Sequence, residues 1–169
     1  SFMYPDPFVP AFDLTVSMES RGDVTDYARS VNFQTGEATV QWADQRGQYQ
    51  RRLFVSRKDG IAVLSIRGSK GGMVNCRLAM EPRSPSDKLD AKQVERSDEV
   101  FKACVADVTP GADEFGLTYR NGFTKAYPGS IQALEAVARV VSVGGTRSIE
   151  NKESVVIQGA DEVLLLVDI

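Results

Sequence analysis

Short turns recur about every 12 residues through the first 70 residues of the chain, and this rhythm restricts the fold more than any other feature. Polar or glycine-containing turns occupy residues 20–23, 34–37, 44–47 and 57–60. Most runs between them alternate apolar and polar side chains, as strands do when one face is buried, whereas the last begins with four consecutive apolar residues, which suggests burial on both faces. These predicted strands are residues 12–18, 24–33, 38–42, 48–56 and 61–67. A parallel sheet needs helical crossovers, for which there is no room, so the pattern predicts an antiparallel sandwich or barrel.

The rest of the chain continues the β pattern with one interruption. Further strands are expected at residues 73–80, 115–120, 130–143, 154–158 and 162–168. Residues 130–143 also fit helical spacing, but their valines and the all-β surroundings favour a strand. Turns are expected at residues 109–113 and at Asn121-Gly122. The charged, proline-containing segment 82–114 has room for one short helix. The expected fold class is therefore all-β, an antiparallel β-sandwich.

Length and charge narrow the class of protein. The chain has 169 residues, a length that suits one domain, and we expect residues 1–169 to form a single β-sandwich domain. Its net charge of −3 argues against nucleic acid as a partner, because binding to a phosphate backbone needs a basic surface. The longest apolar run, residues 163–167, is far shorter than the roughly 20 residues that span a bilayer, so no membrane partner is expected. Residues 1–7 lack the pattern of a secretory signal, which leaves the cellular location open.

Histidine is absent from the chain, which excludes many kinds of active site. No histidine zinc ligand, no Ser-His-Asp or Cys-His triad and no imidazole acid or base can form. The two cysteines, Cys76 and Cys104, are too few for a cysteine-only zinc site, and the sequence leaves open whether they pair. We therefore expect neither a metal nor another cofactor.

Acidic and aromatic side chains supply the remaining candidates for chemistry. Adjacent carboxylates occur at residues 98–99, 113–114 and 161–162, but neighbouring residues of a strand point to opposite faces and cannot flank one substrate bond. Trp42 has the largest ring in the chain and could stack on a sugar, although a single tryptophan on an alternating strand usually belongs to the core. The residues alone thus predict no catalytic group, and Trp42 is the candidate substrate-binding residue.

Two stretches are more specific than composition. The first contains an alternating strand, a hairpin and two further strands, and the second contains a strand, a Gly-Gly turn and a strand that ends in three leucines. Together they cover residues 12–16, 24–40, 49–56, 60–64, 138–146 and 155–166. In this order they resemble the N-terminal β-sandwich domain of glycoside hydrolase family 95, which contains α-L-fucosidases and related α-L-galactosidases. The resemblance covers most of residues 10–168 and is weakest over residues 82–130.

The resemblance implies a part of a longer enzyme. The family's domain usually starts earlier, with a first hairpin, and its catalytic carboxylates and asparagines lie in a following (α/α)6 barrel. Neither part is present in this sequence, so no catalytic residue of the family can be transferred to a position here. The resemblance implies that the parent enzyme hydrolyses terminal α-L-fucosyl or galactosyl linkages of a carbohydrate with inversion at the anomeric carbon. It also implies that the barrel is the intramolecular partner of this domain. An extracellular or periplasmic location fits such a parent, and we expect the chain alone to be inactive.

Another class of function stays open beside this one. The chain could be a stand-alone carbohydrate-binding or interaction module with a β-sandwich fold, in which Trp42 would be the stacking platform. The triplet Arg21-Gly22-Asp23 matches the minimal integrin-binding tripeptide, but this is also a common turn composition. Burial of Trp42 is the first observation that separates these readings.

Overall fold

The computed structural model describes residues 11–83, 91–124 and 131–169, and within these ranges the chain forms twelve strands and one helix. The elements are β1 (Asp13–Ser17), β2 (Thr25–Asn32), β3 (Glu37–Asp44), β4 (Gly47–Ser56), β5 (Ile61–Gly68), β6 (Val74–Glu81), α1 (Ala91–Cys104), β7 (Val105–Ala112), β8 (Gly116–Phe123), β9 (Ala133–Val143), β10 (Thr146–Glu150), β11 (Ser154–Ala160) and β12 (Glu162–Asp168). No helix in the described ranges is long and apolar enough to cross a membrane.

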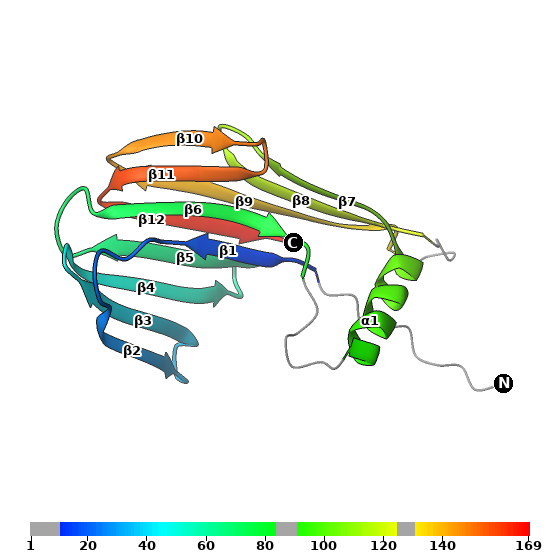
Figure 1. The fold of residues 1–169 in the computed structure, drawn as a ribbon, viewed down its shortest axis with the longest axis horizontal. Helices are drawn as coiled ribbons and strands as arrows, with labels where there is room; N and C mark the ends of the chain where they lie inside the picture. Colours follow the sequence, from blue (N-terminus) through cyan, green and yellow to red (C-terminus); the bar gives the residue numbers. More distant parts are fainter. Residues whose placement is uncertain (1–10, 84–90, 125–130) are drawn as a thin grey trace.

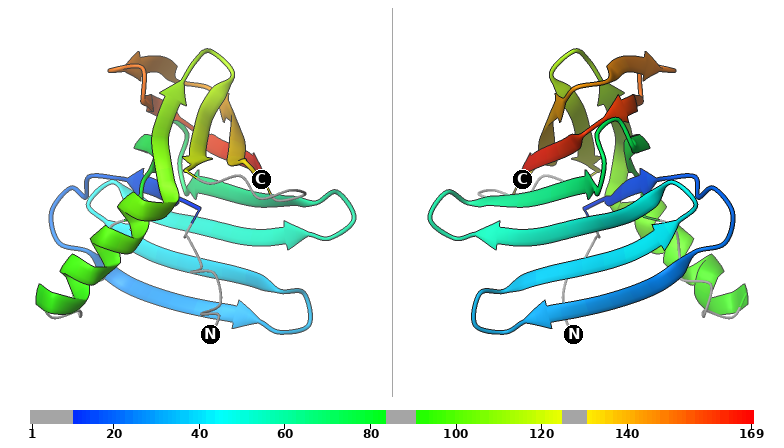
Figure 2. Two further views of the ribbon diagram at one scale, coloured as in Figure 1. Left: turned by 90° about the vertical axis from the view of Figure 1, so that its right-hand side faces the viewer. Right: turned by 90° about the vertical axis from the view of Figure 1, so that its left-hand side faces the viewer.

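The strands form two antiparallel sheets of unequal width (Figure 1). The large sheet has eight strands in the order β2-β3-β4-β5-β12-β9-β8-β7, and the small sheet has four in the order β1-β6-β11-β10. The large sheet twists strongly, so that β2–β5 run across the direction of β7–β9 in the end-on views of Figure 2. The small sheet packs on one face of the large one, which from here on is called the inner face.

The core lies between the two sheets, where alternate residues of both are buried. From the large sheet it takes Ile66, Val163 and Leu165, none of which has exposed surface. From the small sheet it takes Leu78 and Ile157, which are equally buried. Burying a side chain of this size contributes about 1.5 to 3 kcal/mol relative to exposure, so this double layer supplies most of the stabilisation.

The expected fold class is confirmed, and so are most of the expected strands. All five strands expected in the first 70 residues are present as β1–β5, within one or two residues of the predicted ends. Residues 130–143 were expected as a strand, and β9 starts at Ala133, while residue 130 lies outside the described residues. The helix expected within residues 82–114 is α1. The structure has neither cysteine paired: Cys76 is buried and Cys104 half-buried.

Two expected turns are wrong, because both are strands. Residues 109–112 belong to β7, where Pro110 pairs with Tyr119; proline is tolerated there because β7 is an edge strand. Asn121 and Gly122 continue β8 instead of turning. Asn121 is buried, and its side-chain amide donates a hydrogen bond of 3.1 Å to the carbonyl oxygen of Ala11, which fixes the entry to β1.

Candidate functional site

Trp42 lies at the end of a stack of three planar groups on the inner face. It pairs with Tyr49 across β3 and β4, and the two rings stack with centroids 5.2 Å apart and planes inclined by 12°. The guanidinium carbon of Arg46 lies 5.6 Å from the centroid of the Tyr49 ring. Tyr49 is buried, whereas Trp42 is half-buried and does not belong to the core. Because the stack holds the indole from one side, Trp42 can present a fixed aromatic surface.

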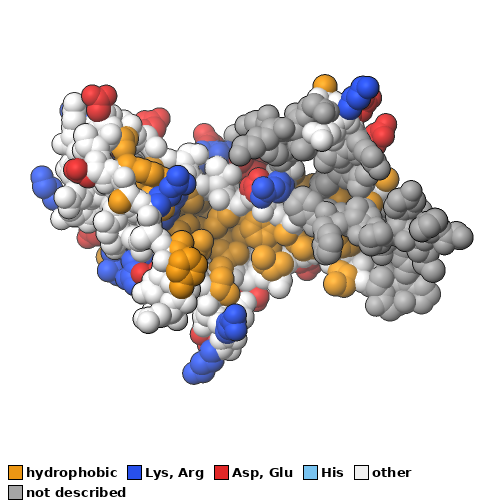
Figure 3. Space-filling view, turned by 90° about the horizontal axis from the view of Figure 1, so that it is seen from below, with side chains coloured by type: hydrophobic (Ala, Val, Ile, Leu, Met, Phe, Trp, Pro, Cys, Tyr) orange, Lys and Arg blue, Asp and Glu red, His pale blue; other side chains and the backbone are white. Residues whose placement is uncertain are grey.

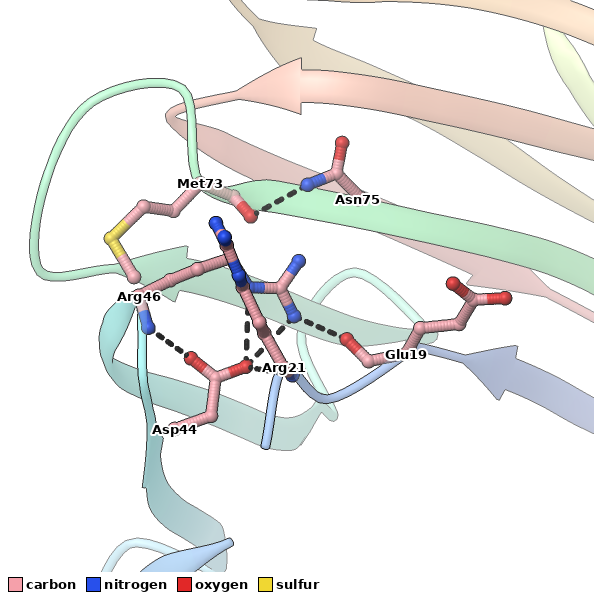
Figure 4. A network of polar contacts seen from close by, with 6 residues as sticks. All are labelled: Glu19, Arg21, Asp44, Arg46, Met73 and Asn75. Carbon is pink, nitrogen blue, oxygen red and sulfur yellow. Dashed lines mark hydrogen bonds and ion pairs between the residues drawn. The ribbon is translucent and has the colours of Figure 1, made fainter. Parts of the chain in front are cut away.

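A polar network fixes the Arg46 end of this stack (Figure 4). The side chain of Arg46 donates to Asp44 Oδ2 from Nε and Nη2 at 3.1 and 2.8 Å, and its Nη2 also donates to the carbonyl oxygen of Glu19. The backbone N–H groups of Arg21 and Arg46 donate to the same carboxylate, each at 2.8 Å. The network thus ties the β1–β2 connection to the β3–β4 turn.

The charge of Asp44 is strongly favoured by this arrangement. Burial on its own would raise the pKa of the carboxyl, but the hydrogen bonds from Arg46 and from the backbone of Arg21 outweigh it and lower the pKa from 3.8 to about 2. A carboxylate held ionised by four donors is a poor general acid. Asp44 therefore serves as an anchor for the stack.

A polar depression of about 320 Å³ adjoins Trp42 and Tyr49. Its other lining residues carry amide, guanidinium, hydroxyl or carboxylate groups, namely Asp26, Gln41, Gln48, Gln50, Arg67 and Ser69, together with Gly68. Planar hydrogen-bonding groups beside an aromatic ring suit a hydroxylated ligand such as a sugar. With one carboxylate in the lining, the depression offers no pair of carboxyl groups for glycoside hydrolysis.

The comparison with family models identifies the class of this domain. The model described as glycosyl hydrolase family 65, N-terminal domain, matches residues 1–169. The chain belongs to this family. A comparison with curated proteins gave no match.

Membership of family 65 confirms the coarser part of what the sequence predicted. The chain is an N-terminal domain of a glycoside hydrolase family, it has a β-sandwich fold, and its family implies association with a catalytic domain in the parent protein. The match names family 65, so the resemblance to family 95 is not confirmed as an assignment.

Three of the six carboxylates that the sequence singled out have structural roles in the family 65 domain, whereas the side chain of Asp98 lies outside the described part of the structure. Asp113 accepts hydrogen bonds from the backbone N–H groups of Phe115 and Gly116, and Asp161 accepts one of 2.7 Å from the N–H of Gly72. Glu162 pairs with Arg67 at 2.7 Å. In the described part of the chain, no group of three or more His, Cys, Asp or Glu side chains could hold a metal ion. Burial raises the pKa of the Cys76 thiol to about 11, which makes it a weak nucleophile.

Sequence reasoning found Trp42 but missed the stack around it. The turn that carries Asp44 and Arg46 was recognised, yet its link to Arg21 joins residues 23 positions apart. An alternating strand also gives no sign that Trp42 and Tyr49 face each other, because that depends on the register of β3 and β4. The only signal in the sequence was the cluster of aromatic and arginine residues on either side of one turn.

Asp44→Asn is expected to lower the free energy of unfolding by about 2 kcal/mol at pH 7, because it removes the charge that four donors surround. The folded-state pKa lies below the unfolded one, so this stabilisation is complete above about pH 4 and is lost as the pH falls through about 2. Urea titrations of both proteins between these pH values measure it. Asp23→Asn is the control, because Asp23 is exposed and has no hydrogen bond or ion pair with the described residues. A difference that stays constant over this pH range would contradict the role of the Asp44 charge.

Proposed function

We propose that residues 1–169 form a single accessory sandwich domain of a glycosidase that removes terminal α-L-fucosyl or α-L-galactosyl groups. The full-length match to a glycoside hydrolase N-terminal domain is the observation that carries this proposal. Three of the candidate carboxylates support it further, since backbone N–H groups donate to Asp113 and Asp161, and Arg67 pairs with Glu162. The catalytic groups would then lie in a neighbouring (α/α)6 barrel of the same protein, and the sugar specificity is taken from the resemblance of residues 10–168 to family 95.

An apolar surface supports contact with a catalytic domain. The outer face of the large sheet, which the small sheet leaves bare, carries Phe54, Val141 and Val143 with 38%, 42% and 54% of their surface exposed. They line a hollow of about 340 Å³ together with Val63 and Leu164, and the polar side chains of Arg52, Ser65, Arg67 and Glu162 complete its lining. Exposed apolar patches of this kind mark surfaces that bind another protein or domain.

The isolated chain is expected to release no nitrophenol from aryl α-L-fucosides or α-L-galactosides, because the proposal places the paired carboxyl groups of the glycosidase in the neighbouring barrel. The complete parent protein is expected to release it from one of these substrates. Colorimetric assays of both purified proteins, with aryl glycosides of other sugars as comparison substrates, provide the measurement. Turnover by the isolated chain would disprove the location of the catalytic groups, and activity of the parent on other sugars alone would disprove the substrate.

The stacked Trp42 ring favours a second candidate function, a carbohydrate-binding module that uses the polar depression. Trp42→Ala is then expected to weaken glycan binding by up to about tenfold, because the stacking contact is lost. Phe33→Ala is a suitable control, since Phe33 is 95% exposed and does not line the depression. Glycan-array and calorimetric measurements test this, with circular dichroism to check the fold. Equal affinities of the wild type and Trp42→Ala would exclude the candidate.

A further inference from the structure

The small sheet leaves part of the inner face uncovered. Four strands lie against eight, and the strands left bare are β2, β3 and β4 (Figure 1). On this part of the inner face Val31, Leu53 and Val55 have 55%, 43% and 65% of their surface exposed. On the same face of β5, Leu64 is only 6% exposed. Figure 3, which views the molecule from the side of β2, shows apolar side chains gathered in a hollow.

The small sheet has a free edge next to this open face. β1 pairs with β6 and with no other strand among the described residues, so one side of its backbone is unpaired. Leu14 and Val16 point into the sandwich from β1 but are only half-buried. A free strand edge beside an open apolar face can accept a further strand by backbone hydrogen bonds.

Two arginines on the open face have no acidic partner in the part of the chain that the structure describes. Arg29 on β2 and Arg51 on β4 both lie opposite Val40 of β3, so they stand about 10 Å apart across one intervening strand. Neither forms an ion pair or side-chain hydrogen bond with the described residues, although Arg29 lies over the ring of Tyr27. On the opposite face of β4, Arg52 pairs with Glu37. A half-buried arginine on an apolar face gains most from a carboxylate that covers it.

We propose that this open face binds an extended polypeptide segment from outside residues 1–169, which adds to the free edge of β1 as a fifth strand of the small sheet. Towards the large sheet, the segment alternates apolar side chains over Leu53 and Val55 with a carboxylate at Arg51. The unpaired backbone of β1 and the aliphatic lining favour a polypeptide over a sugar. A second copy of the chain does not fit, because two copies joined through β1 would each bring their own β2–β4 into the same space.

Synthetic peptides of about nine residues test this proposal on the purified chain. The first peptide has threonine at its odd positions and valine, glutamate, isoleucine and valine, in this order, at its even positions. The second peptide has glutamine in place of the glutamate. The third has the same residues as the first in scrambled order. The first peptide is expected to bind with a dissociation constant below about 1 mM and to slow amide exchange in residues 13–17. The scrambled peptide is expected to bind roughly tenfold more weakly.

A pair of adjacent variants tests the role of charge. Arg51→Met is expected to weaken binding of the glutamate peptide roughly tenfold and to leave the glutamine peptide unchanged. Arg52→Met, on the opposite face, is expected to change neither. Failure of the alternating peptide to bind up to about 1 mM would overturn the proposal. Binding that does not slow amide exchange in β1 would overturn it as well, and so would an equal loss of peptide affinity in Arg51→Met and Arg52→Met. Binding of a neutral oligosaccharide that is lost in Arg51→Met would also overturn it.

Discussion

Leu165→Ala is expected to lower the free energy of unfolding by about 3 to 4 kcal/mol, the usual cost of removing most of a leucine from a closed core. Leu165 has no exposed surface and lies in the middle of β12, between Leu64 of β5 and Val140 of β9. Leu78 and Ile157 of the small sheet belong to the same closely packed core, whose side chains cannot fill a new cavity without disturbing their own strands. Equilibrium urea denaturation followed by circular dichroism measures the loss.

Leu53→Ala is the matched control, because it makes the same chemical change on the same inner face. Leu53 pairs with Leu64 but lies where the small sheet does not reach, and 43% of its surface is exposed. Its replacement is expected to cost less than about 1 kcal/mol in the isolated chain. If Leu53→Ala lowers the free energy of unfolding as much as Leu165→Ala does, the inner face over β4 is not open. The open face proposed above as a peptide-binding surface then does not exist.

The contrast between these two leucines marks the limit of what alternation predicts. Short turns, together with period-two patterns or β-prone composition in the runs between them, predicted β1–β5. The same pattern assigns Leu53 and Leu64 to one face, which is correct. It does not reveal how far the second sheet extends over that face. Coverage depends on the number of strands in the small sheet, and pairings such as Ser154 with Ala79 join residues far apart in the chain.

The two strands that the sequence did not predict, β7 and β10, are both edge strands, whereas the other two edge strands, β1 and β2, were predicted. β7 contains Pro110 and Gly111, which resemble a turn, and β10 contains Arg147, Ser148 and Glu150, which resemble a loop. Both strands lie at the edge of their sheet, where one side faces no neighbour and selection for apolar side chains is weak. Local composition therefore fails where an edge strand also carries turn residues or charges, as β7 and β10 do.

The candidate site shows the same division between local and non-local information. The sequence identified Trp42 from its residue type and predicted the turn that contains Asp44 and Arg46, without assigning either of them to the site. The structure adds that Arg46, Tyr49 and Trp42 stack in series, which no spacing rule predicts. The unpaired state of Arg51 was equally hidden, because Arg51 and Arg52 are neighbours of the same type that lie on opposite faces. Only Arg52 has an acidic neighbour, Glu37.

Gly145→Ala is expected to cost at least about 3 kcal/mol or to prevent folding, whereas Gly144→Ala is expected to cost about 1 kcal/mol. Both glycines have a positive φ, 71° and 70°, so the strain of a side chain in this conformation is similar for the two. They differ in the space around them. A Cβ at Gly145 would lie 2.4 Å from the carbonyl oxygen of Gln158 and 2.6 Å from the nitrogen of Ala160, whereas at Gly144 the nearest atoms belong to the Asp161 carboxyl group, at 3.6 Å.

The position of this turn explains why the clash at Gly145 cannot relax cheaply. The Gly144-Gly145 turn carries the chain from β9 of the large sheet to β10 of the small sheet, and the atoms it would strike are backbone atoms of β11. Moving β11 away would disturb its pairing with β6 and the burial of Ile157, whereas the 3.6 Å approach to Asp161 at Gly144 is an ordinary van der Waals contact that needs no movement. Thermal unfolding and the yield of soluble folded protein measure both variants. Equal stabilities of the two variants would mean that the two sheets can separate at this turn. The rigid arrangement of the sheets, on which the proposed peptide binding at the open face depends, would then be disproved.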